Sequence, residues 1–540
     1  MNFPFLSIIT FTPAIAAVLI LALPADHKTE ARMAALAAGI FATILSLYVF
    51  FAYQVDGPRY QFVERLPWVE SLGIDYYLGV DGMSLPLVLL TAIVMLTGVL
   101  ISWGIEDRPR EFFAFLFILA TGVFGVFVSL DLFALFFFYE IAVFPMYLLI
   151  AIWGWVKTRE YAAMKLTLYL FIGSVVSLVG ALAMFAAVKN FTGTITFDML
   201  AIERAQQAGA FNFNVDVLGA SISFERLWFP FVFFGFAVLG GVFPFHNWSP
   251  VGHVAAPTAV SMFHAGVLMK LGAFAALRVG VMLLPEGARF HMPWIVLLTL
   301  CNVVYGAYIA MTQNDLKYMI GYSSVSHMGL VAMGVATLDR YGLTGAGLQM
   351  FSHGVMTALF FASVGMIYDR THTRQINELG GMYRKFSWVA VAFIIGGFTS
   401  MGMPGLSGFA AELPIFLGVW NAKALDTNGY APWFANLITQ PWFFPSVAVI
   451  ASISIVITGA YILRAVQRVF FGEMPHHFEH PDEHHEPLTD ITALDRAALV
   501  ILCGLMIVMG VYPTIIAPLV SSGVTPILQL VNPALAALAR

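Results

Sequence analysis

The sequence predicts an all-α polytopic membrane protein of about 14 transmembrane helices. Of its 540 residues, 60% are hydrophobic and only 11% are charged, and the mean hydropathy is +0.85. Such a composition is typical of a chain that spans a membrane many times rather than of a water-soluble globule. Apolar windows long enough to cross about 30 Å of hydrocarbon recur from one end of the chain to the other.

These windows are separated by short connections, apart from two longer ones at residues 54–83 and 189–226. A short surface helix is expected between Asn190 and Gln207, and the tail after Val520 is expected to lie along the membrane. The predicted spans fall near residues 5–23, 33–53, 84–103, 112–130, 132–153, 164–188, 227–245, 257–284, 293–312, 318–337, 342–367, 387–420, 446–471 and 497–519.

Two of these spans are interrupted by glycine and proline, over Val238 to Pro257 and over Met401 to Pro414. Interrupted helices at matching places in two halves are typical of transporters built from inverted repeats. The sequence therefore predicts two inverted five-helix repeats with a broken helix in the fourth span of each. The predicted organisation is 1–111 for the N-terminal helices, 112–284 and 293–471 for the repeats, and 472–540 for a His-rich loop, the last helix and the C-terminal tail.

The basic residues predict the orientation of the chain. Of its 26 Lys and Arg residues, fifteen follow odd-numbered spans, ten follow even-numbered spans and one, Lys270, lies within a span. The positive-inside rule then places both termini on the outer side of the membrane. In a bacterial inner (plasma) membrane that side is the periplasm.

Several classes of function are not supported by the sequence. A net charge of −5 predicts no nucleic-acid partner, and neither a dinucleotide nor a nucleotide-triphosphate motif is present. Cys301 and Cys503 lie in apolar runs, without the spacing of an iron–sulfur or haem site. We therefore expect no cofactor and no metal on this chain. The loop with His476, His477, His480, His484 and His485 is expected to be solvated rather than a metal site, because no order of ligands is defined.

Lys270 is the most informative residue of the chain. If a helix starts near Pro257, Lys270 lies about 20 Å along it, far from either end. A lysine in the middle of a membrane costs about 2.5–3.5 kcal/mol, so such a residue indicates a functional site. A lysine that extends to the membrane surface would have to lie near a helix end.

Four further ionisable residues lie deep in predicted spans. Glu140 is about 12 Å from the start of its span, His327 and His353 lie in the middle of theirs, and Glu412 follows the second break. Buried lysine, glutamate and histidine can exchange protons near neutral pH. A proton relay is the functional interpretation. The alternative for each histidine alone is a packed residue bonded to a carbonyl, and His264, six positions before Lys270, is expected to be structural.

Six segments of the chain together resemble a known family. They read FFFYEIAVFPMYLLIAIWG, FPFHNW with APTAVSMFHAGVLMKLGAFAALR, QNDLKYMIGYSSVSHMGL, FSHGVMTALFF, YDRTHTRQINELGG and GMPGLSGFAAELPIFLG. This set is similar to the antiporter-like subunit M family of bacterial NADH:quinone oxidoreductase, respiratory complex I. The resemblance implies fourteen helices in two inverted repeats, with other membrane subunits, including neighbouring antiporter-like subunits, and the lipid bilayer as partners.

The resemblance also implies roles for single residues. Glu140 matches a fifth-helix glutamate that pairs with a lysine, and Lys270 matches the central lysine of the eighth helix. Glu412 matches a terminal acid that releases protons. His327 and His353 match residues of a central hydrophilic axis, and Lys165 falls near the path by which protons are taken up.

One residue departs from the family pattern. Leu239 occupies the place of the lysine that is expected to pair with Glu140. Three functions are therefore weighed: a proton-translocating subunit of a complex I-type NADH:quinone oxidoreductase, a modified or non-pumping paralogue in such a complex, and a subunit of a Mrp-type cation/proton antiporter or a membrane-bound hydrogenase.

Overall fold

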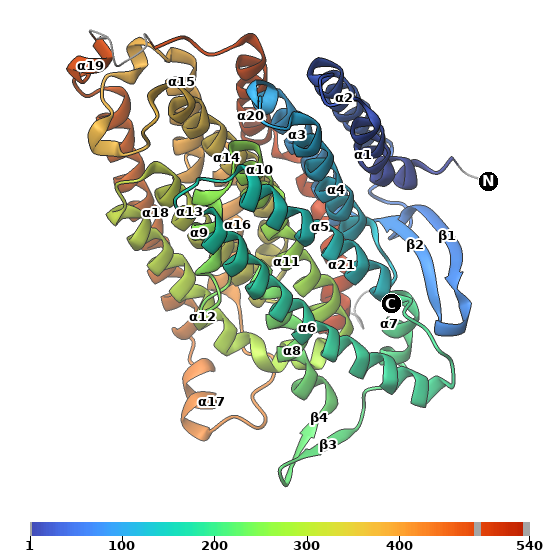
Figure 1. The fold of residues 1–540 in the computed structure, drawn as a ribbon. Helices are drawn as coiled ribbons and strands as arrows, with labels where there is room; N and C mark the ends of the chain where they lie inside the picture. The colour runs from blue at the N-terminus through green and yellow to red at the C-terminus, as the bar shows by residue number, and fades with distance from the viewer. Residues whose placement is uncertain (1–2, 480–487, 533–540) are drawn as a thin grey trace.

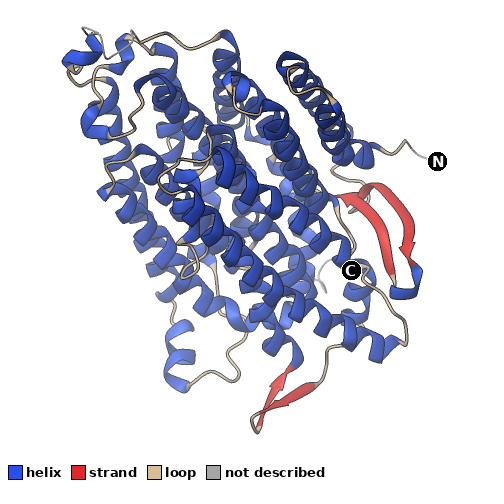
Figure 2. Cartoon of the chain, viewed as in Figure 1, coloured by secondary structure: helices blue, strands red, loops and turns tan. Residues whose placement is uncertain are grey.

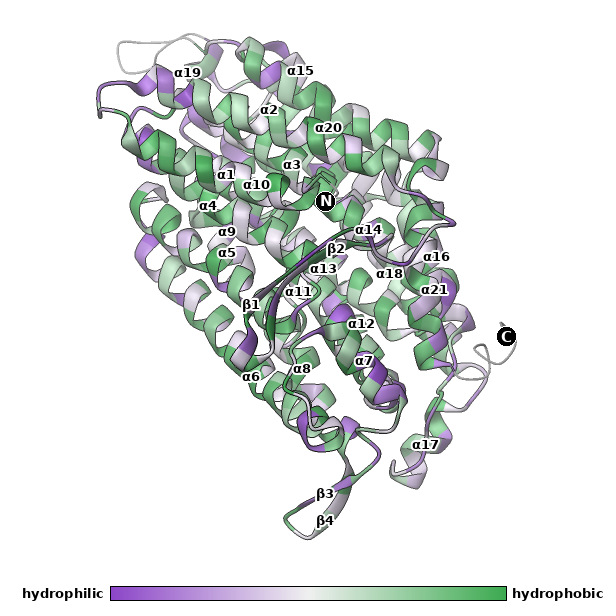
Figure 3. Cartoon of the chain, turned by 90° about the vertical axis from the view of Figure 1, so that its right-hand side faces the viewer, coloured by the Kyte–Doolittle hydropathy of each residue, from purple (hydrophilic) through white to green (hydrophobic). Residues whose placement is uncertain are grey.

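Long apolar helices run side by side through most of the computed structural model, which describes residues 3–479 and 488–532 (Figures 1 and 2). His480, His484 and His485 of the His-rich loop lie outside the described residues. Figure 3 shows hydrophobic residues over most of the helix surfaces, with many of the hydrophilic ones in the connections and at helix ends. This distribution is the one expected of a bundle that crosses a membrane.

The described residues contain twelve unbroken helical segments that are long and apolar enough to cross a membrane. Two more crossings are made by pairs of shorter helices, α8 with α9 and α15 with α16. Together they account for the fourteen predicted spans, and the predicted fold class is confirmed. The unbroken segments are α1 (Phe5–Ala22), α2 (Lys28–Ala52), α3 (Ser84–Ile101), α4 (Pro109–Val128), α5 (Leu132–Trp153), α6 (Arg159–Thr192), Thr258–Val281, α12 (Pro285–Thr312), α13 (Leu316–Ala336), α14 (Arg340–Thr371), α18 (Phe443–Ala465) and α20 (Ala493–Val511).

Both predicted breaks are present. The first crossing of this kind consists of α8 (Phe224–Leu239) and α9 (Trp248–Ala255), and the second of α15 (Ser387–Ser400) and α16 (Ser407–Asn421). Glycine and proline cause the breaks, because Gly241, Gly402 and Gly405 have positive φ and proline cannot donate a backbone hydrogen bond.

The segment Thr258–Val281 is helical but not a regular α-helix. It consists of α10 (Thr258–Phe263), a π-helical stretch over His264–Leu268, α11 (Met269–Ala275) and a second π-helical stretch over Ala276–Val281. Wide turns of this kind are rare, and they occur frequently at functional sites. Lys270 is the second residue after the first of them.

The connections gather at two opposite ends of the bundle. The end that we call the basic face carries the short connections after α1, α3, α5, α12 and α14. The other end, called the hairpin face, carries two β-hairpins and three short helices. Its elements are β1 (Gln61–Val69), β2 (Ile74–Val80), α7 (Met199–Gln207), β3 (Asn214–Val217), β4 (Ala220–Ser223), α17 (Pro432–Ile438) and α21 (Ala517–Val531). In Figure 1 the hairpin β3–β4 and α17 lie at the bottom and α19 (His476–Glu479) at the top.

The expected surface helix in the second long connection is therefore α7, and the tail after Val520 forms part of α21. The two hairpins were not predicted from the sequence.

The two sets of five crossings run in opposite directions. The five crossings from α4 onward start at the basic face, whereas the five from α12 onward start at the hairpin face. The repeat boundaries at 112–284 and 293–471 stay predictions.

The centre of the bundle is formed by Thr258–Val281, α13 and α14. In the most apolar stretch of each of these segments, 94%, 94% and 100% of the residues are buried, against 39% in α1 and 33% in α20. Ionisable residues on the central segments are therefore kept away from lipid by the flanking helices, which supply the apolar surface that faces the membrane.

Aspartates begin several of the helices. The Asp131 carboxylate accepts the Ala134 N–H at 3.0 Å at the start of α5, and Asp315 accepts the Lys317 N–H at 2.8 Å at the start of α13. Such caps satisfy backbone donors that have no partner within the helix. Asp131 is completely buried, and this burial raises its pKa to about 6.

Candidate functional site

Lys270 lies at the centre of the bundle and is completely buried. Its Nζ donates to the carbonyl oxygen of Ala265, in the π-helical stretch, and lies 2.8 Å from Nδ1 of His353 on α14. The two segments approach closely because glycines face each other, and a Cβ on Gly354 would lie 2.6 Å from the carbonyl oxygen of Gly266. The glycine contact thus brings the lysine within hydrogen-bond distance of the histidine.

The contact between Lys270 and His353 is consistent with either position of the shared proton. A protonated lysine donates to the lone pair on Nδ1, and a neutral lysine accepts from an Nδ1–H. Both arrangements keep the same heavy atoms in place. The pair can therefore exchange a proton without a change of fold.

His327, on α13, follows His353 in space. The centroids of the two rings are 5.3 Å apart, and both side chains are buried. The Nε2 atom of His353 has no hydrogen-bond partner among the described residues. A proton can pass between rings at this distance through one bridging hydrogen-bonded molecule, such as water.

Glu412, on α16, ends the row. Its Oε1 lies 3.1 Å from Nδ1 of His327 and also accepts from Nε2 of Gln349 at 3.1 Å. The other ring nitrogen of His327 lies 3.0 Å from Oγ of Ser400. Both ring nitrogens thus have partners, and the histidine can be neutral or protonated while keeping its orientation.

The break between α15 and α16 adjoins the Glu412 carboxylate. A Cβ built on Gly402, whose φ is +63°, would lie 3.0 Å from Oε2 of Glu412, so the glycine leaves space for this oxygen. The next three residues, Met403 to Gly405, are exposed on the surface of this chain. The row of ionisable groups therefore ends close to the edge of the bundle.

Two of the predicted site residues lie apart from this row. Glu140 is exposed on α5, where its Oε1 accepts from the hydroxyl of Ser174 on α6 at 2.6 Å. Lys165 is half-buried near the basic-face end of α6, and its Nζ donates to Oδ1 of Asn247 at 3.0 Å. Leu239, the last residue of α8, is completely buried.

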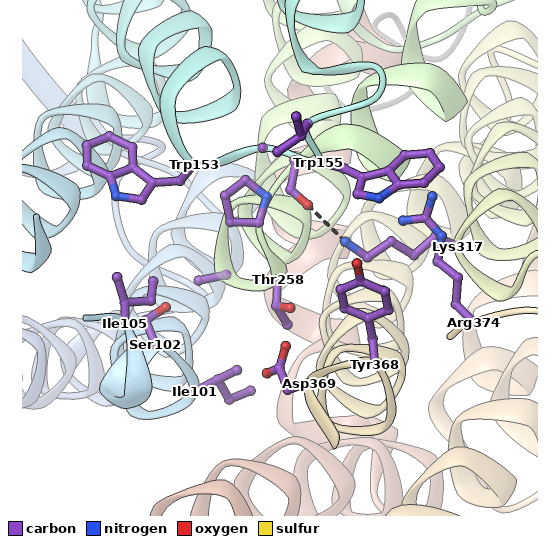
Figure 4. A pocket seen from close by; sticks show the side chains of 15 residues that line it. Ile101, Ser102, Ile105, Trp153, Trp155, Thr258, Lys317, Tyr368, Asp369 and Arg374 are labelled. Atoms are coloured by element: carbon purple, nitrogen blue, oxygen red, sulfur yellow. Dashed lines mark hydrogen bonds between the residues drawn. The ribbon is translucent and has the colours of Figure 1, made fainter. Parts of the chain in front are cut away.

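A cavity of about 360 Å³ near the basic face contains residues that the sequence did not single out (Figure 4). Lys317 is buried in it and donates from Nζ to the carbonyl oxygen of Ala256 at 2.8 Å. Arg374 is also buried, forms a 2.5 Å ion pair with Asp315, and leaves its Nη2 without a partner among the described residues. Asp369 is exposed to this cavity.

A second group is a pair of buried histidines beside the first break, in which His264 is joined by His253, a residue that the sequence analysis did not single out. The rings of His253 and His264 are 4.0 Å apart, and Nε2 of His253 lies 3.1 Å from Oγ of Ser249. Neither nitrogen of His264 has a partner among the described residues. Trp248 stacks on His264 at 5.1 Å. The structural role expected for His264 from the sequence stays a prediction.

Comparison with known sequences gives a consistent assignment. Residues 129–429 match the family described as NADH:quinone oxidoreductase/Mrp antiporter, transmembrane. The chain is 36% identical over 473 residues to NAD(P)H-quinone oxidoreductase chain 4 2 of Microcystis aeruginosa, which covers 87% of this chain and 80% of that protein. It is 33% identical over 534 residues to NADH-quinone oxidoreductase subunit M of Rhodobacter capsulatus, and the match covers 97% of this chain and 96% of that protein.

Solved structures share the fold. A chain of respiratory complex I from Thermus thermophilus matches with a TM-score of 0.80 and 24% identity, over 98% of this chain and all of that chain. A chain of the Mrp complex from Dietzia sp. matches with a TM-score of 0.78 and 19% identity, over 99% of each chain. At these identities the matches show a common architecture.

Proposed function

Because the chain belongs to the NADH:quinone oxidoreductase/Mrp antiporter family, we propose that it is a membrane-arm subunit of a complex I-type quinone oxidoreductase that translocates protons. We propose that the protons pass along Lys270, His353, His327 and Glu412. The redox chemistry is placed in other subunits of the assembly, and this chain supplies the path through the membrane.

The observation that carries the proposal is the continuity of the row. Lys270 and His353 are in hydrogen-bond contact, the two histidine rings are 5.3 Å apart, and His327 contacts Glu412 at 3.1 Å. Each of the four residues is at least 97% buried. Ionisable groups at such depth are costly in a membrane, and a connected series of them is the arrangement that proton relays use.

The charge distribution supports a proposed direction of transport. We propose that the basic face lies on the inner side of a bacterial membrane, with both termini on the outer side. The cavity beside Lys317 opens near the basic face and supports proton uptake there. Glu412, beside the exposed break, is proposed to release protons towards the outer side. Lys165 and Glu140 are proposed to act outside this row.

A second candidate function is a modified paralogue in the same type of complex. It is favoured by Leu239, because no basic side chain occupies the position expected to pair with Glu140. In such a subunit, the half of the path that starts at Glu140 would be idle, and the row from Lys270 to Glu412 would work alone. A Mrp-type antiporter is the third candidate, supported by the shared fold.

The test is the substitution Lys270→Ala in the whole complex. The variant removes the Nζ contact with His353 and should abolish the contribution of this subunit to proton transport, while the complex still assembles. The measurement is the number of protons moved per electron by the purified complex in sealed vesicles. A ratio equal to that of the wild type would overturn the relay. Sodium-dependent transport in place of proton transport would favour the Mrp-type candidate.

A further inference from the structure

Asn302 is a completely buried polar residue of α12 that lies outside the proposed proton path. Along the helix it is about 25 Å from the start and about 15 Å from the end, so it lies deep in the membrane. Burying an amide is costly unless its polar atoms form hydrogen bonds. The Asn302 side chain makes three of them, and all three partners belong to segments other than α12.

Two of these hydrogen bonds are made with the first break, which comprises residues 240–247 between α8 and α9. The Phe243 N–H donates to Oδ1 of Asn302, and Nδ2 of Asn302 donates to the carbonyl oxygen of Gly241 at 3.2 Å. Gly241 has a φ of +71°, so the helical hydrogen-bond pattern does not continue through it. One side chain thus supplies both a donor and an acceptor to the backbone of the break.

The third hydrogen bond is made with the turn of α13 that carries His327. Nδ2 of Asn302 donates to the carbonyl oxygen of Val325 at 2.7 Å. A Cβ on Gly329 would lie 2.7 Å from Cβ of Asn302, so this turn packs directly on the asparagine. Val325 and Gly329 are each two positions from His327, which is about 200° around the helix. Asn302 therefore holds the side of the turn that is opposite to the imidazole.

We infer that Asn302 is a positioning residue that ties the first break to His327, so that a displacement of the break changes the contact of His327 with Glu412. Irregular backbone between two helices is displaced more easily than a helix, because it has fewer hydrogen bonds of its own. The nitrogen of His327 lies 3.1 Å from the Glu412 carboxylate, and a shift of about 1 Å carries this pair beyond hydrogen-bond distance. An amide does not titrate, so Asn302 acts by position alone. The inference rests on the proposed proton path.

The first test measures backbone hydrogen exchange in the complete complex, over residues 241–248 and 322–330. Asn302→Leu keeps a similar shape and removes all three hydrogen bonds, so exchange should become at least about tenfold faster in both segments. Ser326→Ala is the control. The Ser326 hydroxyl donates to the carbonyl oxygen of Val303 at 2.7 Å, so it joins α13 to α12 without contacting the break. Exchange over residues 241–248 should therefore equal that of the wild type in Ser326→Ala.

The second test measures protons moved per electron in sealed vesicles. The ratio should fall in Asn302→Leu, whereas electron transfer with an uncoupler should stay within about twofold of the wild type. Thr299→Val removes a buried hydroxyl that is bonded within α12, to the carbonyl oxygen of Val296 at 2.8 Å, and should leave the ratio unchanged. Wild-type exchange in Asn302→Leu, faster exchange at the break alone, or a wild-type ratio would each overturn the inference.

Gly329→Ala approaches the same link from α13 and keeps the amide, so it serves if Asn302→Leu does not assemble. The added Cβ presses on Asn302 and should make exchange over residues 241–248 several-fold faster, although the change is made on another helix. Unchanged exchange there would contradict the link. Hydrogen exchange does not depend on proton transport. The link can therefore fail while Lys270→Ala supports the path, and it can be present when Lys270→Ala refutes the path.

Discussion

The contact between His327 and Glu412 sets the energy of a proton in the row. The two side chains are almost completely buried and their charged atoms are 3.1 Å apart. With an effective dielectric constant of about 20, a protonated His327 gains about 5 kcal/mol from the Glu412 carboxylate. Moving one charge against 100 mV costs about 2.3 kcal/mol. A change in this single contact is therefore large enough to drive or block proton transfer.

The substitution Glu412→Gln removes the charge and keeps the shape. The amide oxygen can still accept from His327, so the fold is expected to be retained. A positive charge on the histidine loses about 5 kcal/mol of attraction to the carboxylate, and this energy corresponds to nearly four orders of magnitude in an equilibrium constant. Proton transport through this row should be abolished on the timescale of turnover.

The assay uses the purified complex in sealed vesicles, with NADH oxidation and proton uptake measured together. Protons moved per electron should fall, whereas electron transfer in the presence of an uncoupler should stay within about twofold of the wild type. Glu70→Gln, which makes the same chemical change at an exposed site on the hairpin face, is the control. An unchanged ratio in Glu412→Gln would refute the role assigned to this pair.

Two other predictions concern single positions. Gly402→Ala should lower the free energy of unfolding by about 1–2 kcal/mol, because alanine is disfavoured at a positive φ, and it should displace the Glu412 carboxylate. The melting temperature and the proton-to-electron ratio should therefore both fall. Gly104→Ala, where the added Cβ meets nothing within 4 Å, should change neither. For Asp131, burial raises the pKa from 3.8 to about 6, so the folded state holds the proton more tightly. The resulting stabilisation, about 3 kcal/mol, is complete below about pH 4 and is lost as the pH rises through 6. The melting temperature of Asp131→Asn should therefore depend less on pH than that of the wild type between pH 4 and 7, and equal slopes would contradict this assignment.

The sequence predicted the crossings and the depth of the site residues because both depend on distance along one helix. Apolar windows fix where a span begins and ends, and the rise per residue places Lys270, His327 and His353 far from water. Glycine and proline located both breaks. The contact of Lys270 with His353 needed the structure, since it depends on the close approach of two glycines from separate segments.

The direction in which Glu140 points could not be predicted. In a soluble protein the apolar stripe of a helix shows which side is buried, but α5 is apolar on all sides because lipid and protein core are equally apolar. Lys317 is the second residue of α13 but falls one residue before the predicted span 318–337, because helix boundaries are uncertain by a few residues. Its place in a cavity depends on Asp369 and Arg374, which follow more than fifty positions later in the chain.

The π-helical stretch before Lys270 has a consequence for how this protein can vary. A wide turn contains one residue more than a regular α-helical turn. Removal of a single residue from His264–Leu268 would restore the ordinary winding and abolish the wide turn in which the Ala265 carbonyl accepts from Nζ of Lys270. Lys270 would then lose this acceptor. Homologous chains should therefore tolerate insertions and deletions in the hairpins, while the number of residues between Pro257 and Lys270 should be constant.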